Sequence, residues 1–376
     1  MKRILIIQTQ IKHYRVPFFV KLHSALRANN ICMRVAYADP ITTDERNDNA
    51  ELPDEVGVKV TPRHFLGGRV LYFPLLREVA KADLIISEQA NRQLLNYVLL
   101  ICSIIGLKKI AFWGLGENKG ASRSAPSEWI RRRIAKKVHW WFAYTEGTKK
   151  YLMENGVREG HITVVRNAVD TGESFSLLSE IDDREVIAAR LHLKISMDAA
   201  VGLYLGALLP DKGLDLLFQA AELTKARIAG FHLIVVGGGE EHAMVERACI
   251  AHPWMHYVGP KFGREKAIFL KMASALLIPG RVGLAILDGF AAGLPLLTTE
   301  IRHHGPEIEY LQSGYNGLIS PSTPEAYADS IVSFFSNELL RDMINRGARE
   351  SSLRYSVDSM VKNFEMGIQS CIELKP

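Results

Sequence analysis

Residues 274–299 form the stretch that most restricts how this chain can fold. Ala275 to Ile278 is a short apolar run, which is typical of a strand buried on both faces of a sheet. A helix is predicted from about Gly283 to Ala292, and the next strand begins at Leu296. Two buried strands joined by a helix are the repeating unit of an α/β protein with a parallel sheet.

The residues that separate these elements also predict an anion site. Pro279 and Gly280 end the first strand. Gly293 suits the left-handed position that follows a helix, and Pro295 prevents the helix from continuing. A glycine-bearing loop before a helix presents free N–H groups and the positive end of the helix dipole, and Asp288 on that helix is close enough to reach a ligand. The same pattern also fits an ordinary crossover connection without a ligand. Other parts of the chain must decide between these two interpretations.

Length and cysteine use restrict the class of protein. A chain of 376 residues favours two domains. The four cysteines lie far apart and show no zinc-binding spacing, so we expect reduced thiols and a cytoplasmic protein. The first apolar run, Ile4 to Ile7, is too short for a signal peptide and predicts a strand. No stretch approaches the roughly 20 apolar residues of a membrane span, and the longest, Leu94 to Leu107, predicts a buried or surface-lying helix.

The net charge of +5 hides an asymmetry along the chain. Residues 1–170 carry a balance of +11, whereas residues 171–376 carry a balance of −6. The two halves are therefore expected to face different partners. A basic half suits an anionic surface such as a membrane, a nucleic acid or a pyrophosphate.

Apolar runs alternate with helix-length segments in both halves, which indicates two doubly wound α/β domains, expected to face each other across a cleft. Residues 171–198 are polar and lack strand signals, so they are predicted to link a domain of residues 1–170 to one of residues 199–355. Residues 356–376 are predicted to be a helix that packs back toward the N-terminal domain. The predicted strands cover residues 4–7, 32–37, 83–87, 109–113, 139–144 and 162–165 before the linker, and 200–205, 231–236 and 256–258 after it.

Two further glycine-bearing turns follow predicted strands in the second half. The turn from Gly206 to Gly213 places Lys212 beside a helix start, which suits a phosphate or diphosphate, although most such lysines are solvated. Gly237 to Gly239 is not a Gly-x-Gly-x-x-Gly fingerprint, and the acidic residue of a dinucleotide site is missing, so NAD binding is disfavoured. The sequence also has no Walker element, no Asp-x-Asp motif and no convincing metal-ligand spacing.

The order of these motifs resembles the nucleotide-sugar domain of the retaining glycosyltransferases of family 4, which have the GT-B fold. The resemblance spans about residues 199–320 and extends to Asn167–Asp170 and to the last helix. It implies that the chain moves a sugar from a nucleoside diphosphate sugar to a hydroxyl with retention of configuration, without a metal or another cofactor. The matching segments are Gly206 to Gly213, Leu233 to Gly239, Val258 and Gly259, residues 279–295, His304 to Glu307, and Ser313 to Gly317.

The sequence departs from the family pattern at two charged positions. The family usually has an arginine where Ala207 stands, and two glutamates eight positions apart where this chain has Gly280 and Asp288. Asp288 can still supply the carboxylate that the family places on the ribose hydroxyls, whereas Gly280 cannot contact the transferred sugar. We hypothesise that Arg281 replaces the charge missing at Ala207; the alternative is that Arg281 is solvated or pairs with an acidic side chain.

The resemblance also implies which residues bind the donor. The segment Pro260 to Phe262 would line the base, with Phe262 either stacking on it or serving as plain packing. Lys212, Arg281 and Asp288 are the candidates for catalysis. The predicted donor-binding residues are Gly206, Lys212, Gly213, Gly237, Pro260, Lys261, Phe262, Arg281, Val282, Gly283, Leu284 and Asp288.

The first half would hold the acceptor, which the family resemblance suggests is a lipid-linked saccharide of a bacterial surface polymer. Residues 119–137 hold seven basic residues and one acid, with Trp129, Ile130, Ile134, Trp140 and Trp141 within or just after them. This composition predicts an amphipathic helix on an anionic membrane, hence a peripheral protein on the inner membrane face. The alternative is a solvated face above buried tryptophans. The candidate acceptor contacts are Tyr14, Arg15, Glu88, Asn91, Arg92 and Glu117.

Three other functions fit parts of the sequence. A nucleotide-sugar epimerase shares the fold, and a non-catalytic donor-binding subunit would tolerate the loss of the glutamate at Gly280. The basic patch also suits nucleic acid, but a nucleotide-sugar domain in the same chain makes a lipid surface the simpler partner and disfavours nucleic acid.

Overall fold

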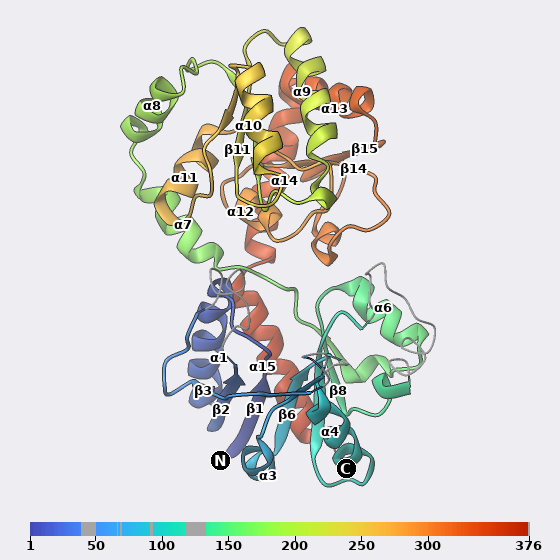
Figure 1. Ribbon diagram of the computed structural model, residues 1–376. Helices are drawn as coiled ribbons and strands as arrows, with labels where there is room; N and C mark the ends of the chain where they lie inside the picture. The colour runs from blue at the N-terminus through green and yellow to red at the C-terminus, as the bar shows by residue number, and fades with distance from the viewer. Residues whose placement is uncertain (39–49, 66, 68–69, 91–92, 117–132, 375–376) are drawn as a thin grey trace. The chain divides into compact units, whose positions relative to one another are not determined.

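A computed structural model describes residues 1–376 except 39–49, 66, 68–69, 91–92, 117–132 and 375–376. The chain divides into two compact units, one made of residues 1–167 and 357–376 and the other of residues 168–356. Each unit is a parallel sheet wrapped by helices (Figure 1). The prediction of two doubly wound α/β domains is therefore confirmed.

The described part of the first unit contains a seven-stranded sheet in the order β3-β2-β1-β6-β7-β8-β9, in which all neighbours are parallel, and a small β4-β5 hairpin. Its strands are β1 (Lys2–Ile7), β2 (Ile31–Tyr37), β3 (Gly57–Lys59), β4 (Arg63–Phe65), β5 (Val70–Tyr72), β6 (Leu84–Glu88), β7 (Lys109–Gly114), β8 (Trp140–Ala143) and β9 (Ile162–Val164). Its helices are α1 (Val16–Ala28), α3 (Leu76–Lys81), α4 (Leu94–Ile104), α6 (Glu146–Glu154) and α15 (Val357–Glu373), with 3-10 turns η1 (His13–Arg15) and η2 (Glu159–His161).

Helix α15, at the end of the chain, completes the core of the first unit. Its Phe364 ring stacks on Phe142 of β8 with 4.6 Å between centroids, and it meets Trp113 of β7 edge-on at 4.9 Å. Phe18 of α1 lies 4.9 Å from the same ring. The apolar positions of α15 therefore bury against α1 and the sheet, as an amphipathic helix requires.

The second unit has a six-stranded parallel sheet in the order β12-β11-β10-β13-β14-β15. Its strands are β10 (Ala200–Leu205), β11 (Phe231–Val236), β12 (Met255–Tyr257), β13 (Ala275–Leu277), β14 (Leu296–Thr299) and β15 (Gly317–Ser320). Its helices are α7 (Thr171–Glu180), α8 (Asp183–His192), α9 (Leu214–Arg227), α10 (His242–Ala251), α11 (Gly263–Met272), α12 (Ala285–Ala291), α13 (Pro324–Ser336) and α14 (Glu338–Arg354), with 3-10 turns η3 (Pro210–Lys212) and η4 (Pro306–Tyr310).

The stretch around residues 274–299 folds as strand, loop, helix and strand, as predicted. Strand β13 and strand β14 are fully buried neighbours in the sheet. Gly293 has a φ of 72°, the left-handed conformation expected after a helix. Helix α12 covers seven residues and begins at Ala285, two residues later than predicted.

The prediction that residues 171–198 are a linker is wrong, because most of them form helices α7 and α8 of the second unit. Asp182 and Glu185 form a reciprocal capping box at the start of α8. Arg264 of α11 donates a 2.7 Å hydrogen bond to Glu185, and the buried Arg190 donates a 2.8 Å bond to the carbonyl of Met272. These polar contacts with α11 anchor a segment that lacks strand signals.

Candidate active site

The second unit has a topological switch point between β10 and β13, the two central strands of its sheet. Chain segments leave these strands in opposite directions along the sheet, so a crevice opens at their carboxyl ends, where open α/β sheets bind ligands. The turn at residues 206–213 follows β10, and the loop at residues 278–284 follows β13. The switch point therefore brings two of the sequence-predicted donor segments together.

Backbone hydrogen bonds join this turn to this loop. The amide of Gly280 donates to the carbonyl of Lys212 at 3.0 Å, and the amide of Arg281 donates to the carbonyl of Asp211 at 2.8 Å. The ammonium of Lys212 donates to the carbonyl of Arg281 at 2.7 Å. Together these contacts hold Lys212 and the β13 loop in one fixed arrangement.

Glycines make this close approach of backbones feasible. A Cβ atom on Gly280 would lie closer than 3.0 Å to the backbone of both Lys212 and Asp211. A Cβ atom on Gly237 would likewise overlap the carbonyl of Gly206, and Gly213 adopts a left-handed φ of 67° beside Gly280. The glycine at 280 is thus required by the packing of the two segments, which leaves no room for a side chain at this position.

Lys212 is partly buried among charged groups. Burial lowers the pKa of its ammonium; Asp211 and Glu307 act in the opposite direction, and Arg281 lowers the pKa further. Glu307 is itself buried, at the start of η4. Sequence reasoning named the His304 to Glu307 segment only as part of a pattern and assigned it no role.

Arg281 pairs with an acidic side chain, which was one of the alternatives open from the sequence. Its guanidinium lies 3.3 Å from the Asp211 carboxylate, and about half of each side chain is exposed. An exposed ion pair of this kind contributes little to the free energy of unfolding. The contact with Asp211 uses Nη1, and a guanidinium has five N–H donors, so binding a diphosphate does not require Arg281 to leave Asp211.

His304 holds the loop after β13 through Val282. The Val282 amide donates to Nδ1 of His304 at 3.3 Å, while Nε2–H of the ring donates to the Thr299 carbonyl at 2.8 Å. The Gly305 amide donates to the carbonyl of Val282 at 3.0 Å. Burial lowers the pKa of His304, which favours the neutral ring that this arrangement needs.

This geometry corrects one predicted donor contact. The Val282 N–H is already used by His304, so it is not available to a ligand in this arrangement. Gly283 and Leu284 are partly exposed, and their amides precede α12. Because α12 is so short, the anion site depends on Lys212 and the adjoining turn more than on a helix dipole.

Asp288 occupies the predicted place on α12, but its carboxylate has a partner. The ammonium of Lys266 on α11 lies 2.7 Å from Oδ1, and the Asp288 side chain is 16% exposed. Sequence reasoning missed Lys266 because it is 22 residues away. The proposed contact of Asp288 with ribose hydroxyls stays a prediction.

The predicted base-binding segment lies between β12 and α11. Lys261 pairs with Glu265 at 3.1 Å, and Pro260 is exposed beside Gly238. Phe262 is 78% exposed at the N-cap of α11, so it is not core packing. Its ring is available for stacking, which stays a prediction.

The first unit has its own switch point between β1 and β6. Glu88, at the end of β6, accepts hydrogen bonds from the amide of Thr9 at 3.2 Å and from its hydroxyl at 3.0 Å. This contact spans the carboxyl ends of the two strands, where a ligand is expected. Among the other candidate acceptor residues, Asn91, Arg92 and Glu117 lie outside the described residues.

Arg15 is buried and does not present an open acceptor contact, which corrects its predicted role. Its guanidinium lies 4.7 Å from the ring of Trp113, 5.2 Å from the ring of Tyr14 and 5.9 Å from the ring of Tyr144. Nη1 also contacts the sulfur of Met360 at 3.6 Å. Aromatic faces stabilise a cation removed from water, so Arg15 packs as part of the core of the first unit.

The predicted membrane helix at residues 119–137 falls largely outside the described residues. Trp140 and Trp141 are buried in β8, so their assignment to a membrane-facing helix is wrong. Trp140 donates to Thr163, and Trp141 donates to the carbonyl of Ala135, both at 2.9 Å. The buried-tryptophan alternative is correct for these two residues.

The remaining expectations concern metal binding and membrane spanning. In the described part of the chain, no three or more His, Cys, Asp or Glu side chains gather to form a metal site. The expectation that no metal is required stays a prediction. Of the helices in the described ranges, none combines the length and apolar composition needed to cross a bilayer.

Comparisons with known proteins identify the domain that carries the switch-point site. Residues 188–351 match the family described as Glycosyl transferases group 1. The uncharacterized glycosyltransferase MJ1178 of Methanocaldococcus jannaschii is 23% identical over 274 residues, which are 63% of this chain and 74% of that protein. The family match thus includes Lys212, Arg281 and Asp288.

Solved structures extend the likeness to both units. A glycosyltransferase from Rickettsia africae has a TM-score of 0.72 at 16% identity, with 98% of each chain covered. Anabaena Alr3699/HepE in complex with UDP has a TM-score of 0.70 at 16% identity, with 98% of this chain and 100% of that chain covered. The family match and these neighbours support a glycosyltransferase that uses a nucleotide sugar. Residues 188–351 are thus similar to the Glycosyl transferases group 1 domain, and the chain has the GT-B fold.

Proposed function

We propose that this chain transfers a sugar from a nucleoside diphosphate sugar to a hydroxyl of a lipid-linked saccharide, with retention of configuration. The observation that carries the proposal is the bonded pair of segments at the β10–β13 switch point, which holds Lys212 inside the family-matched region. A fixed ammonium beside exposed amides is suited to a diphosphate.

The proposed chemistry relies on positioning and charge stabilisation. The bond between the anomeric carbon and the diphosphate oxygen breaks, and the acceptor oxygen forms the new bond on the same face of the sugar. The proton of the acceptor hydroxyl goes to the departing phosphate oxygen, so no separate protein base is needed. Lys212 and the amides of Gly283 and Leu284 would stabilise the charge on the leaving group.

The proposal also covers the donor base and the acceptor. Because the neighbouring Anabaena protein was solved with UDP, uridine nucleotides are the first to test. The basic first half of the chain and the family likeness support a lipid-linked acceptor in bacterial surface polysaccharide synthesis. We place the protein at the cytoplasmic face of a membrane, consistent with four free cysteines.

Calorimetry with nucleoside diphosphates tests donor binding. We expect the native chain to bind one of UDP, GDP, dTDP or CDP, and Lys212→Met to bind it at least tenfold more weakly, because one charge-assisted bond contributes roughly 1.5–3 kcal/mol. Lys194→Met removes an exposed lysine of the same unit and serves as the matched control. Negligible heat with every nucleotide for the native chain would overturn the proposal.

Product analysis then separates transfer from its rivals. Anomeric proton couplings of the product report whether configuration is retained. A new sugar isomer formed from donor alone would identify an epimerase instead. Donor binding without hydrolysis or transfer over a broad acceptor panel would identify a non-catalytic subunit, which the absence of a carboxylate at Gly280 favours.

A further inference from the structure

Helix α4 of the first unit and the residues just after it expose a stripe of large apolar side chains, called here the α4 stripe. The stripe consists of Leu94, Val98, Ile101, Ile104, Ile105 and Leu107, whose side chains are between 38% and 66% exposed. The first five follow helical spacing and fall on one face, while Leu95 and Leu99 on the opposite face are buried against the sheet. A contiguous apolar surface of this kind marks a contact with a partner.

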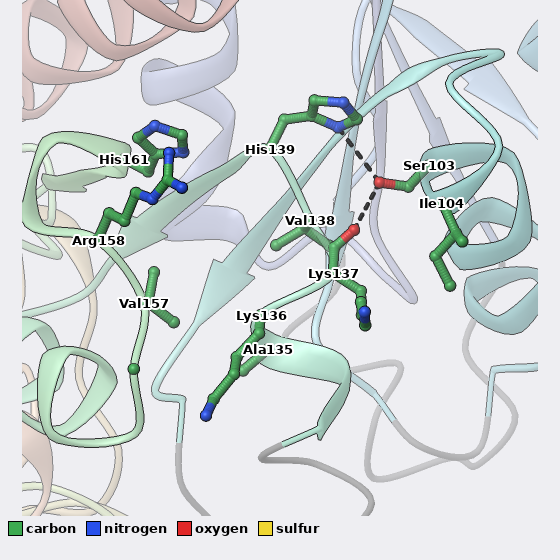
Figure 2. A pocket seen from close by; sticks show the side chains of 11 residues that line it. Ser103, Ile104, Ala135, Lys136, Lys137, Val138, His139, Val157, Arg158 and His161 are labelled. Carbon is green, nitrogen blue, oxygen red and sulfur yellow. Dashed lines mark hydrogen bonds between the residues drawn. The ribbon is translucent and has the colours of Figure 1, made fainter. Parts of the chain in front are cut away.

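A basic pocket opens at the end of this stripe. It has a volume of about 470 Å³ and is lined by Ile104 of α4 together with Lys136, Lys137 and Arg158 (Figure 2). The three basic side chains are exposed, and no acidic side chain is among the described residues that line the pocket. The nearby carboxylate of Glu159 pairs with Lys149 at 2.7 Å. Within the described residues, the lining of the pocket is therefore positively charged.

Hydrogen bonds fix the stripe and the pocket to each other. The hydroxyl of Ser103, the residue before Ile104, donates to the carbonyl of Lys137 at 2.6 Å and lies 3.2 Å from Nδ1 of His139 (Figure 2). The end of α4 and the segment that carries the lysines thus belong to one rigid surface of the first unit.

We propose that the α4 stripe and the basic pocket together dock the first unit on an anionic phospholipid bilayer. The stripe would enter the boundary between headgroups and acyl chains, and the lysines and Arg158 would meet lipid phosphates. A second copy of the chain fits less well, because a two-fold contact through this face would bring its basic pockets close to one another. The inference deepens the membrane association proposed above and assigns it to residues other than the tryptophans.

Vesicle co-sedimentation of the full chain tests the surface. We expect binding to mixed phosphatidylcholine and phosphatidylglycerol vesicles at low salt, and much weaker binding to phosphatidylcholine alone. Ile101→Ser with Ile104→Ser, and separately Lys136→Glu with Lys137→Glu, should each weaken binding about tenfold or more. The matched controls are Ile250→Ser with Leu339→Ser, which are 83% and 84% exposed in the second unit, and Lys194→Glu with Arg247→Glu.

Equal vesicle binding by the native chain, the double isoleucine variant and the double lysine variant would overturn the proposal. Failure of the native chain to bind anionic vesicles would overturn it as well. Sedimentation velocity also measures whether the chain is a monomer or a dimer. A native dimer that Ile101→Ser with Ile104→Ser converts to a monomer, without vesicle binding, would assign the face to a second copy. Nucleotide binding measured in solution is independent of vesicles, so a failure of the donor site and a failure of this surface are distinguishable.

Discussion

The ammonium of Lys212 donates a 2.7 Å hydrogen bond to the backbone carbonyl of Arg281, 69 residues further along the chain. The contact joins the turn after β10 to the loop after β13 at the centre of the sheet. The cation expected to meet a diphosphate is therefore held in place by the same backbone that would form the rest of the site.

Gly280→Ala tests how closely these two segments must approach. The new Cβ atom would overlap the backbone of Lys212, so we expect a loss of about 2 kcal/mol in unfolding free energy, together with weaker nucleotide binding. Gly283→Ala is the control for stability, because nothing lies within 4 Å of its Cβ position. Chemical denaturation and calorimetry measure both effects. Equal stability of the two variants would contradict the packing argument.

Arg281→Ala and Asp211→Asn separate two roles of one ion pair. Both variants break the exposed pair, so each should change unfolding free energy by less than about 1 kcal/mol. If Arg281 binds the donor, Arg281→Ala alone should weaken nucleotide binding, by roughly 1–3 kcal/mol. Titration calorimetry with the nucleotide on both variants decides between these two roles. The same loss in both would mean that only the pair matters, and no loss in either would retire the donor role.

Acidification should weaken nucleotide binding through His304. Burial holds its pKa below the usual 6.5, so the ring that accepts from Val282 is neutral at pH 7.5 and becomes protonated only as the pH falls through that lowered pKa. We expect His304→Ala to bind more weakly at pH 7.5 and to lose less affinity between pH 7.5 and about 5.5. Any change in affinity that His304→Ala still shows with pH comes from other groups, such as the nucleotide phosphate. His303→Ala, at the neighbouring position, is the control. Parallel pH profiles for native and His304→Ala chains would show that the ring is not the titrating group.

The stacked pair of His232 and His256 predicts acid sensitivity of the second unit. Their ring nitrogens lie 3.0 Å apart, and burial lowers the pKa of His256 to about 4. Because the unfolded chain binds the proton more readily, stability present above the ordinary value of 6.5 is lost as the pH falls toward 4. His256→Gln should reduce the fall in melting temperature between pH 7 and about 5, by an amount on the order of 5 °C. His242→Gln, at an exposed position, should leave that fall unchanged.

Arg15→Met and Arg15→Lys distinguish packing from acceptor binding. Both variants disturb the cation above Trp113, so we expect each to lower the unfolding free energy by about 1–2 kcal/mol. Arg27→Met, at an exposed position of the following helix α1, should have little effect. A change in acceptor KM with unaltered stability would restore Arg15 to the acceptor site.

The parts of the fold that depend on local sequence were predictable. A short window of neighbouring residues is enough to recognise the apolar runs of β13 and β14 and the glycine after α12. Residues 171–198 were misread because α7 and α8 are held by polar contacts with α11, which no local apolar pattern reveals. Trp140 and Trp141 were placed at a membrane by composition, although the strand that contains them buries both.

The candidate site was predictable in its segments and not in its contacts. Lys212 and Arg281 were identified as charges near a strand end, but their mutual bond joins positions 69 residues apart. The partners of Asp288 and Val282 were likewise missed, because Lys266 and His304 come from other elements. Gly280 was recognised as a departure from a family pattern. Only the packed backbones explain why a side chain is excluded there.

The place of α15 in the first unit has a consequence for biosynthesis. Phe18, Trp113 and Phe142 pack against Phe364, which the ribosome makes only after all of residues 168–356. Residues 168–356 can complete their own core while that helix is still inside the exit tunnel. The sheet of residues 1–167 therefore completes its aromatic core only after residues 168–356 have been made, and until then its aromatic surface is exposed to chaperones.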